Sequence, residues 1–169
     1  MKHILLFLSL ALATSGYSQR SVPFGTDGDK VNSACSLIRA YSPDVYNYIT
    51  SRSNVQSFLD SDGERFSSTN RIDGGKEKTY WILTGFGSIR ERSKYHLAGV
   101  IFHESMHMLI AERRMAEGRS GFFSDLSARQ QKQEEFLIYK MEIDLLTRMN
   151  APYWEIQEIR EWMEPYKPR

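Results

Sequence analysis

The sequence predicts one α+β domain, in which a small sheet lies against a buried helix and two further helices follow. Three observations predict this fold class. Residues 79–84 (TYWILT) combine aromatic and β-branched side chains, which favours a strand. Residues 93–117 carry apolar side chains on nearly every side of a helix, which indicates a helix buried inside the domain. Residues 128–149 and 152–163 also carry apolar residues at helical spacing.

Turn-forming residues mark the ends of the elements in the first half of the chain. Residues 19–32 are rich in them and are expected to form a loose lead-in. Ser42 as N-cap, Pro43 at the first helical position and Asp44 in the first turn predict the start of a helix. Residues 60–75 contain Asp-Gly and Gly-Gly steps, so a loop or short hairpin is expected there.

Glycine and small polar residues separate the later elements. Gly85 and Gly87 end the strand expected at residues 79–84. Residues 118–127 (GRSGFFSDLS) are expected to end the first long helix and to form a loop before the second. With neither an internal repeat nor a low-complexity tract, residues 33–169 are expected to form a single domain.

The first 18 residues have the pattern of a secretory signal peptide. Lys2 precedes an apolar run over residues 4–13, and small residues follow, with Ser18 as the expected last residue of the signal. The run is shorter than the roughly 20 residues that a membrane-spanning helix needs. A secreted or periplasmic protein without a stable membrane anchor is therefore expected.

Charge and cysteine content exclude several classes of protein. The formal net charge is +1, and loss of Lys2 with the signal would leave an uncharged chain. Nucleic-acid binding requires a basic surface, so a nucleic-acid partner is not expected. Pairs such as Arg113 and Arg114 are interpreted as solvated faces. Cys35 is the only cysteine, so an internal disulfide is impossible and stability must come from the core or from a metal.

The most informative motif is H-E-x-x-H at residues 103–107, inside the buried helix. Residues four apart project from nearly the same side of a helix, so His103 and His107 can bind one Zn²⁺. Glu104 lies beside them as a candidate general base, able to accept a proton from water. The motif predicts a zinc site with the chemistry of a hydrolase.

Catalytic zinc usually has three protein ligands, so a third must come from elsewhere. A third histidine at the spacing H-E-x-x-H-x-x-G-x-x-H is excluded, because Ile110 and Arg113 occupy the glycine and histidine positions. In the helix 128–149, Glu135 and Glu142 lie in the middle of the apolar face, where an unpaired carboxylate is costly. Glu135 is the first candidate ligand, and Glu142 is the alternative.

These residues together resemble the gluzincin branch of the zincins, the zinc metallopeptidases with H-E-x-x-H and an acidic third ligand on a second helix. The resemblance covers about residues 95–145. It implies His103, His107 and Glu135 as zinc ligands, although Tyr139 stands where the family motif E-x-x-x-D has aspartate. It also implies a minimal zincin-like domain over residues 33–169, with a peptide or protein substrate laid along the edge strand.

The resulting hypothesis is a secreted zinc metallopeptidase in which Glu104 acts as general base during peptide-bond hydrolysis. Two alternatives remain at this point. One is an exported, non-catalytic binding domain with structural zinc or none; the other is a secreted effector protease with one narrow target.

Overall fold

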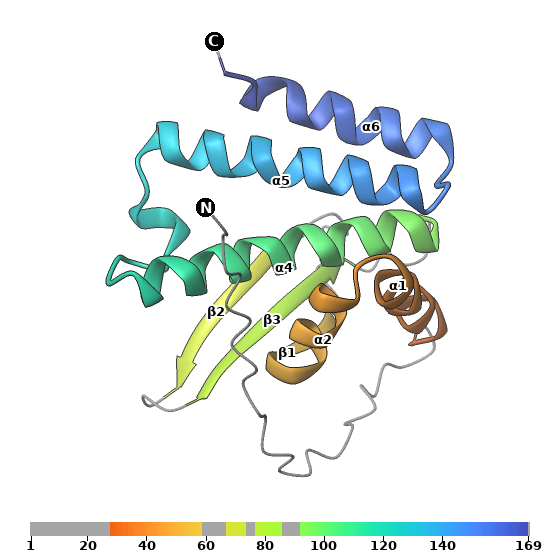
Figure 1. Cartoon of the computed structure of the whole chain (residues 1–169). Coiled ribbons are helices and arrows are strands. Elements are labelled where there is room, and N and C mark those ends of the chain that lie inside the picture. Colours follow the sequence, from red (N-terminus) through yellow and green to blue (C-terminus); the bar gives the residue numbers. More distant parts are fainter. Residues whose placement is uncertain (1–27, 59–66, 74–76, 86–91, 169) are drawn as a thin grey trace, which may run out of the picture.

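The computed structural model describes residues 28–58, 67–73, 77–85 and 92–168, with side chains from residues 29–50 and 92–168. In chain order it contains the helices α1 and α2, the strands β1, β2 and β3, and then the helices α4, α5 and α6 (Figure 1). The first elements are α1 (Gly28–Tyr41), α2 (Pro43–Arg52), β1 (Ser53–Phe58), β2 (Ser67–Asp73) and β3 (Glu77–Gly85). The later helices are α4 (Lys94–Ala116), α5 (Ala128–Arg148) and α6 (Tyr153–Met163), with short 3₁₀ turns at Phe123–Asp125 and Glu164–Tyr166.

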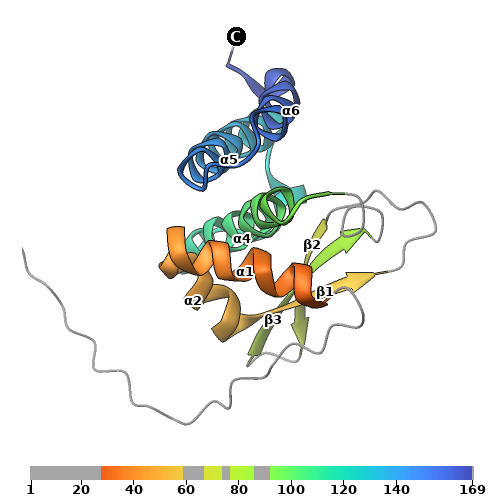
Figure 2. The same cartoon turned by 90° about the vertical axis from the view of Figure 1, so that its right-hand side faces the viewer.

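Helix α4 lies in the middle of the molecule. Helices α5 and α6 lie on one side of it, and α1, α2 and the strands lie on the other (Figures 1 and 2). Its side chains are buried along most of its length, as the distribution of apolar residues predicted. The prediction of a buried central helix is confirmed, and its polar residues must find partners within the fold.

The ends of the C-terminal helices follow from local hydrogen bonds. The Ser93 hydroxyl accepts hydrogen bonds from the amides of Tyr95 and His96, which fixes the start of α4. Ser127 and Gln130 form a capping box at the start of α5. The bounds predicted for these helices and for α6 are confirmed to within a residue, because capping is decided by neighbours in the sequence.

Helix α4 ends in a Schellman motif. Gly118 has a φ of 74°, its amide donates to the carbonyl of Met115, and the Arg119 amide donates to the carbonyl of Arg114. Helix α5 ends in the same way, with Asn150 at a φ of 54°. Each of these turns reverses the direction of the chain. As a result, α5 packs against α4 and α6 packs against α5.

The loose lead-in expected over residues 19–32 ends earlier than predicted. Helix α1 begins at Gly28, and Val31 is already buried, as are Ala34 and Ile38 further along the same helix. These residues recur at the spacing of one helix face and pack against α4. The turn-forming residues Gly28 and Asp29 therefore begin a helix, with the carboxylate in its first turn.

The predicted fold class was wrong. The residues that carry described side chains are 83% helical, and all of the buried cluster among them except Met149 and Ala151 comes from helices, so this part of the chain is helical rather than an α+β domain built around a sheet. The strand pattern at 79–84 suggested that a sheet would form part of the core. The apolar faces of five helices already supply each other with a core, so the pattern does not decide the fold class. The cluster consists of Val31, Ala34, Ile38, Val45, Tyr48, Ile49, Leu97, Ala98, Ile101, Phe102, Met108, Leu145, Leu146, Met149, Ala151, Ile156 and Ile159.

The strand predicted at residues 79–84 is confirmed as part of β3, but its predicted place at the edge of the sheet was wrong. The backbone segments β1, β2 and β3 pair in the order β1-β3-β2, so the segment that contains residues 79–84 has a neighbour on each side. A strand paired on both sides has no free edge on which a peptide could add another strand. The substrate position expected from the sequence is therefore excluded.

Among the helices of the described residues, none is long and apolar enough to cross a membrane. The expected signal peptide, residues 1–18, lies outside the described part of the chain.

Candidate metal centre

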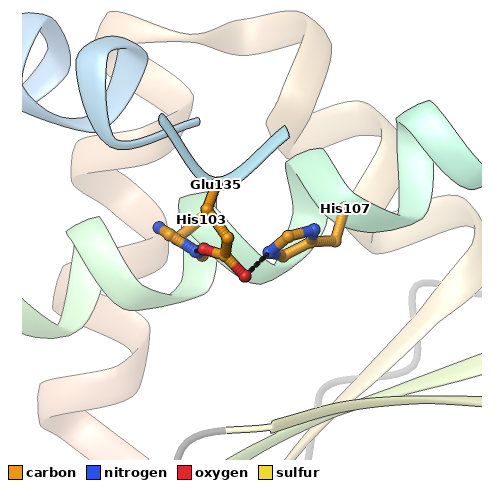
Figure 3. Close-up of side chains that lie close together, drawn as sticks. All are labelled: His103, His107 and Glu135. Atoms are coloured by element: carbon orange, nitrogen blue, oxygen red, sulfur yellow. Dashed lines mark ion pairs between the residues drawn. The ribbon is translucent and has the colours of Figure 1, made fainter. Parts of the chain in front are cut away.

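The two histidines of H-E-x-x-H project from α4 toward α5, where both meet Glu135 (Figure 3). Contacts along α4 from His103 to Arg114 correspond to contacts along α5 from Glu142 back to Glu134, so the two helices are antiparallel. The two histidines, four residues apart on α4, face three glutamates of α5: Glu134, Glu135 and Glu142. Each helix thus presents one polar strip to the other, inside an otherwise apolar contact.

Both imidazoles turn Nε2 toward the same carboxylate. His103 Nε2 lies 3.3 Å from Glu135 Oε2, and His107 Nε2 lies 3.4 Å from Glu135 Oε1. One ligand atom from each of these residues lies within 4.8 Å of the other two. The structure therefore brings together the three residues that the sequence singled out as zinc ligands.

The other ring nitrogens are held by two further carboxylates. His103 Nδ1 is 2.9 Å from Glu142 Oε2, and His107 Nδ1 is 2.9 Å from Glu134 Oε1. Since a carboxylate accepts hydrogen bonds, each Nδ1 carries the hydrogen and donates it. Nε2 is then the nitrogen of each ring that could bind a metal, once it has given up the proton held toward Glu135, and a carboxylate at Nδ1 is common among metal-binding histidines.

The donor set fits zinc in chemistry and in spacing. Imidazole nitrogen and carboxylate oxygen are ordinary zinc ligands, at about 2.0–2.1 Å from the ion. Two ligand atoms at that distance from a tetrahedral ion are about 3.3 Å apart, close to the 3.3 Å and 3.4 Å between the histidine nitrogens and Glu135. Three carboxylates around the histidines also supply the negative charge that a buried cation needs.

Burial and the neighbouring charged groups shift the pKa values of the two histidines and of Glu135 in opposite directions. Burial lowers the pKa of His103, but hydrogen bonds with Glu135 and Glu142 outweigh it and raise the pKa to about 10. Burial also lowers the pKa of His107, and the bonds to Glu134 and Glu135 raise it overall. Burial raises the pKa of Glu135, whereas its bonds with both histidines reduce it to about 2. Without a metal, His103 therefore holds an extra proton at neutral pH.

Aromatic rings border the group at both ends. The Tyr139 ring meets His103 edge to face at 4.6 Å, and the Phe123 ring meets His107 in the same way at 5.2 Å. Tyr166 lies against Tyr139, with 5.6 Å between ring centroids. Burial and the charges of Glu135 and Glu142 raise the pKa of Tyr139, so its hydroxyl keeps its proton. A protonated phenol beside the metal group can donate a hydrogen bond.

Glu104 follows His103 on α4 and is partly buried. Its charge acts on both His103 and Tyr139, raising the pKa of each. The candidate general base therefore lies near the metal group.

The alternative third ligand, Glu142, occupies a different position. Its carboxylate faces Nδ1 of His103, the nitrogen turned away from Glu135. The sequence could identify both glutamates as acids on an apolar face. It could not decide which of them faces which nitrogen, because that depends on how α4 and α5 pack.

Two residues of this centre, Glu134 and Arg114, were not predicted from the sequence. Glu134 lies at the edge of the apolar face of α5, yet its side chain is only 7% exposed. Arg114 was interpreted as part of a solvated face, and that was wrong: its side chain is 6% exposed, whereas that of Arg113 is 83% exposed. The sequence did indicate that Arg114 faces the interior, because it follows His107 by seven residues and so lies on the same face of the helix.

His96 also lies on that helix face, at the start of the buried stretch of α4. It is 1% exposed, and its ring meets Trp162 edge to face at 5.8 Å, so it is a core residue. Burial and the charge of Arg92 lower its pKa. The metal group found among the described residues does not include it.

Comparisons of the chain with protein-family models, with curated protein sequences and with solved structures gave no match. Interpretation of the centre therefore depends on its own geometry and chemistry.

Proposed function

We propose that this protein is an exported zinc metallopeptidase, with His103, His107 and Glu135 as zinc ligands and Glu104 as general base. One observation carries the proposal: both Nε2 atoms converge on the Glu135 carboxylate, and one ligand atom from each of the three residues lies within 4.8 Å of the others. The carboxylates at both Nδ1 atoms support it, because they orient the histidines as metal ligands. Export is proposed from the sequence of residues 1–18 alone.

Zinc in this position would act as a Lewis acid on the carbonyl of the scissile peptide bond and would lower the pKa of a water. Glu104 accepts the proton of the attacking water and passes it to the leaving amine. The Tyr139 hydroxyl, which keeps its proton, donates a hydrogen bond to the oxygen on which negative charge develops. The substrate is a peptide or protein, which cannot add a strand alongside β3 because β3 is paired on both sides.

A second candidate function is a non-catalytic domain that needs no metal. One observation favours it: all four ring nitrogens of His103 and His107 already have a carboxylate partner. Protonated histidines would then form a closed network of ion pairs that holds α4 to α5. Metal content separates this candidate from the first.

The deciding experiment measures zinc in the purified protein by elemental mass spectrometry, before and after reconstitution at neutral pH. About one zinc per chain is expected, and His103→Ala should lose it. A protein that takes up no zinc would contradict the metallopeptidase and support the ion-pair network.

Catalysis has its own test in Glu104→Gln. This variant should keep its zinc and lose hydrolysis of a peptide library by about 100-fold or more, since the amide cannot accept the proton. Glu161→Gln, which changes an exposed residue of α6, is the matched control and should keep full activity. Unchanged hydrolysis in Glu104→Gln would exclude Glu104 as the base.

A further inference from the structure

Arg114 is a buried arginine near the end of α4, and the proposed chemistry does not use it. Its side chain is 6% exposed. It lies on the same helix face as His107, two turns further along. A buried guanidinium needs a compensating charge and several acceptors, so its partners indicate its role.

The first partner connects it to the metal group. Arg114 Nη1 donates to Glu134 Oε2, and the other oxygen of this carboxylate, Oε1, accepts from His107 Nδ1 at 2.9 Å. A continuous chain of two hydrogen bonds therefore runs from the guanidinium to a proposed zinc ligand. Glu134 lies between them with its side chain 7% exposed, held from both sides.

The other partners are carbonyls of the segment that follows α4. Arg114 Nη2 donates to the carbonyl of Gly121 at 3.1 Å, and Nε donates to that of Ser120 at 3.3 Å. Gly121 is buried against Met115, so closely that a Cβ atom would lie 2.8 Å from the Met115 side chain. The close fit and the two hydrogen bonds fix this part of the segment against α4.

The same segment touches the metal group directly. Phe123, two residues after Gly121, meets the His107 ring edge to face at 5.2 Å. His107 is therefore contacted by Phe123 and, through Glu134 and Arg114, connected to Ser120 and Gly121. Both contacts involve residues 118–125, which we call the post-helix segment.

We propose that Arg114 is a positioning residue that couples the post-helix segment to the zinc ligand His107 through Glu134. This inference rests on the proposed zinc site. The guanidinium is suited to the role because its planar fork donates in three directions at once, to one carboxylate and two carbonyls. Zinc binding at His107 tightens the post-helix segment, and loosening of that segment weakens the zinc.

The closing experiment uses the purified full protein and two metal-based measurements. Zinc affinity is measured by competition with a chromophoric chelator, and hydrogen exchange of residues 118–125 is measured with and without zinc. Wild type should bind one zinc and show slower exchange in the post-helix segment when zinc is present. Arg114→Met and Glu134→Gln should each weaken zinc binding by about 10–100-fold and abolish the zinc-dependent slowing of exchange. Arg113→Met, which changes the exposed neighbour, is the matched control and should change neither.

Two further variants separate positioning from simple loss of structure. Arg114 and Glu134 act through the same chain of hydrogen bonds. The double variant should therefore bind zinc only slightly more weakly than the single variant with the lower zinc affinity. Arg114→Lys should restore part of the zinc affinity, since it keeps the charge but cannot reach all three acceptors. If Arg114→Met fails to fold by circular dichroism, Glu134→Gln carries the test, because it preserves size and one acceptor.

The outcomes are distinct. Zinc binding by wild type together with unchanged affinity and exchange in Glu134→Gln would overturn the positioning role and leave the zinc site intact. Weakened zinc binding in the variants without any zinc-dependent protection of residues 118–125 in wild type would overturn the coupling. A wild-type protein that binds no zinc would overturn the proposed function, and the positioning role with it.

Discussion

Gly99 and Glu142 lie so close together that any side chain at position 99 would have to displace the Glu142 carboxylate. A Cβ atom built on Gly99 would lie 2.7 Å from Glu142 Oε1, closer than real Cβ contacts allow. The other oxygen of the same carboxylate binds Nδ1 of His103, one turn further along α4. A glycine inside a helix costs stability, so its presence here is explained by the space that the carboxylate needs.

Gly99→Ala should therefore displace Glu142 from His103. We expect a loss of stability of about 1–3 kcal/mol by urea unfolding, as for other overpacked core positions, together with weaker zinc binding. The informative comparison is the same substitution in a Glu142→Ala background, where the added methyl group meets no carboxylate. There it should cost much less, because alanine is the better helix former. Equal costs in both backgrounds would contradict the explanation.

The roles of the two α5 glutamates differ, and substitution should separate them. Glu135→Ala should remove the bound zinc, since it deletes a ligand. Glu142→Gln should keep about one zinc per chain and weaken its affinity by about 10-fold or more, because the amide still accepts from His103 Nδ1 but lacks the charge. Elemental mass spectrometry and chelator competition measure both. Asp144→Asn, at an exposed position of α5, is the control. Loss of zinc in Glu142→Gln but not in Glu135→Ala would reverse the assignment.

Zinc binding should compete with protons. In the metal-free protein, burial is outweighed by carboxylate hydrogen bonds, which raise the pKa of His103 to about 10 and raise that of His107. His103 then holds a proton at neutral pH, and zinc must displace it. Zinc affinity should therefore rise as the pH increases from about 6 to about 9, with release of about one proton per ion from His103. Titration calorimetry in buffers of different ionisation enthalpy measures the release; zinc binding without proton release would contradict it.

The end of α4 offers a test that does not involve the metal. Gly118 has a φ of 74°, and a Cβ atom there would meet nothing within 4 Å, so a substitution suffers only from backbone strain. Gly118→Ala should reduce stability by about 1 kcal/mol. Gly118→Asn should cost less, since asparagine tolerates this conformation and already occupies the equivalent position after α5, at Asn150. Urea unfolding compares the two; equal stability of Gly118→Ala and wild type would show that the turn adjusts.

Local patterns in the sequence predicted the parts of the fold that depend on neighbours along the chain. Helices α4, α5 and α6 lie where periodicity, capping residues and turn formers placed them. The helix α1 was predicted less well, because its turn-forming first residues suggested a loop. The fold class was predicted wrongly, because one strand pattern cannot reveal whether the helices already bury each other's apolar faces.

By itself, the sequence determined that His103 and His107 share one face of a helix, and that Glu135 and Glu142 lie on an apolar face that obliges them to find partners. Only the tertiary structure decided that Glu135 meets both Nε2 atoms, while Glu134 and Glu142 take the Nδ1 atoms and Arg114 is buried. The physical reason is that helical spacing fixes directions within one helix. The antiparallel register of α4 on α5, and the close approach permitted at Gly99, fix which groups of the two helices come within reach of each other.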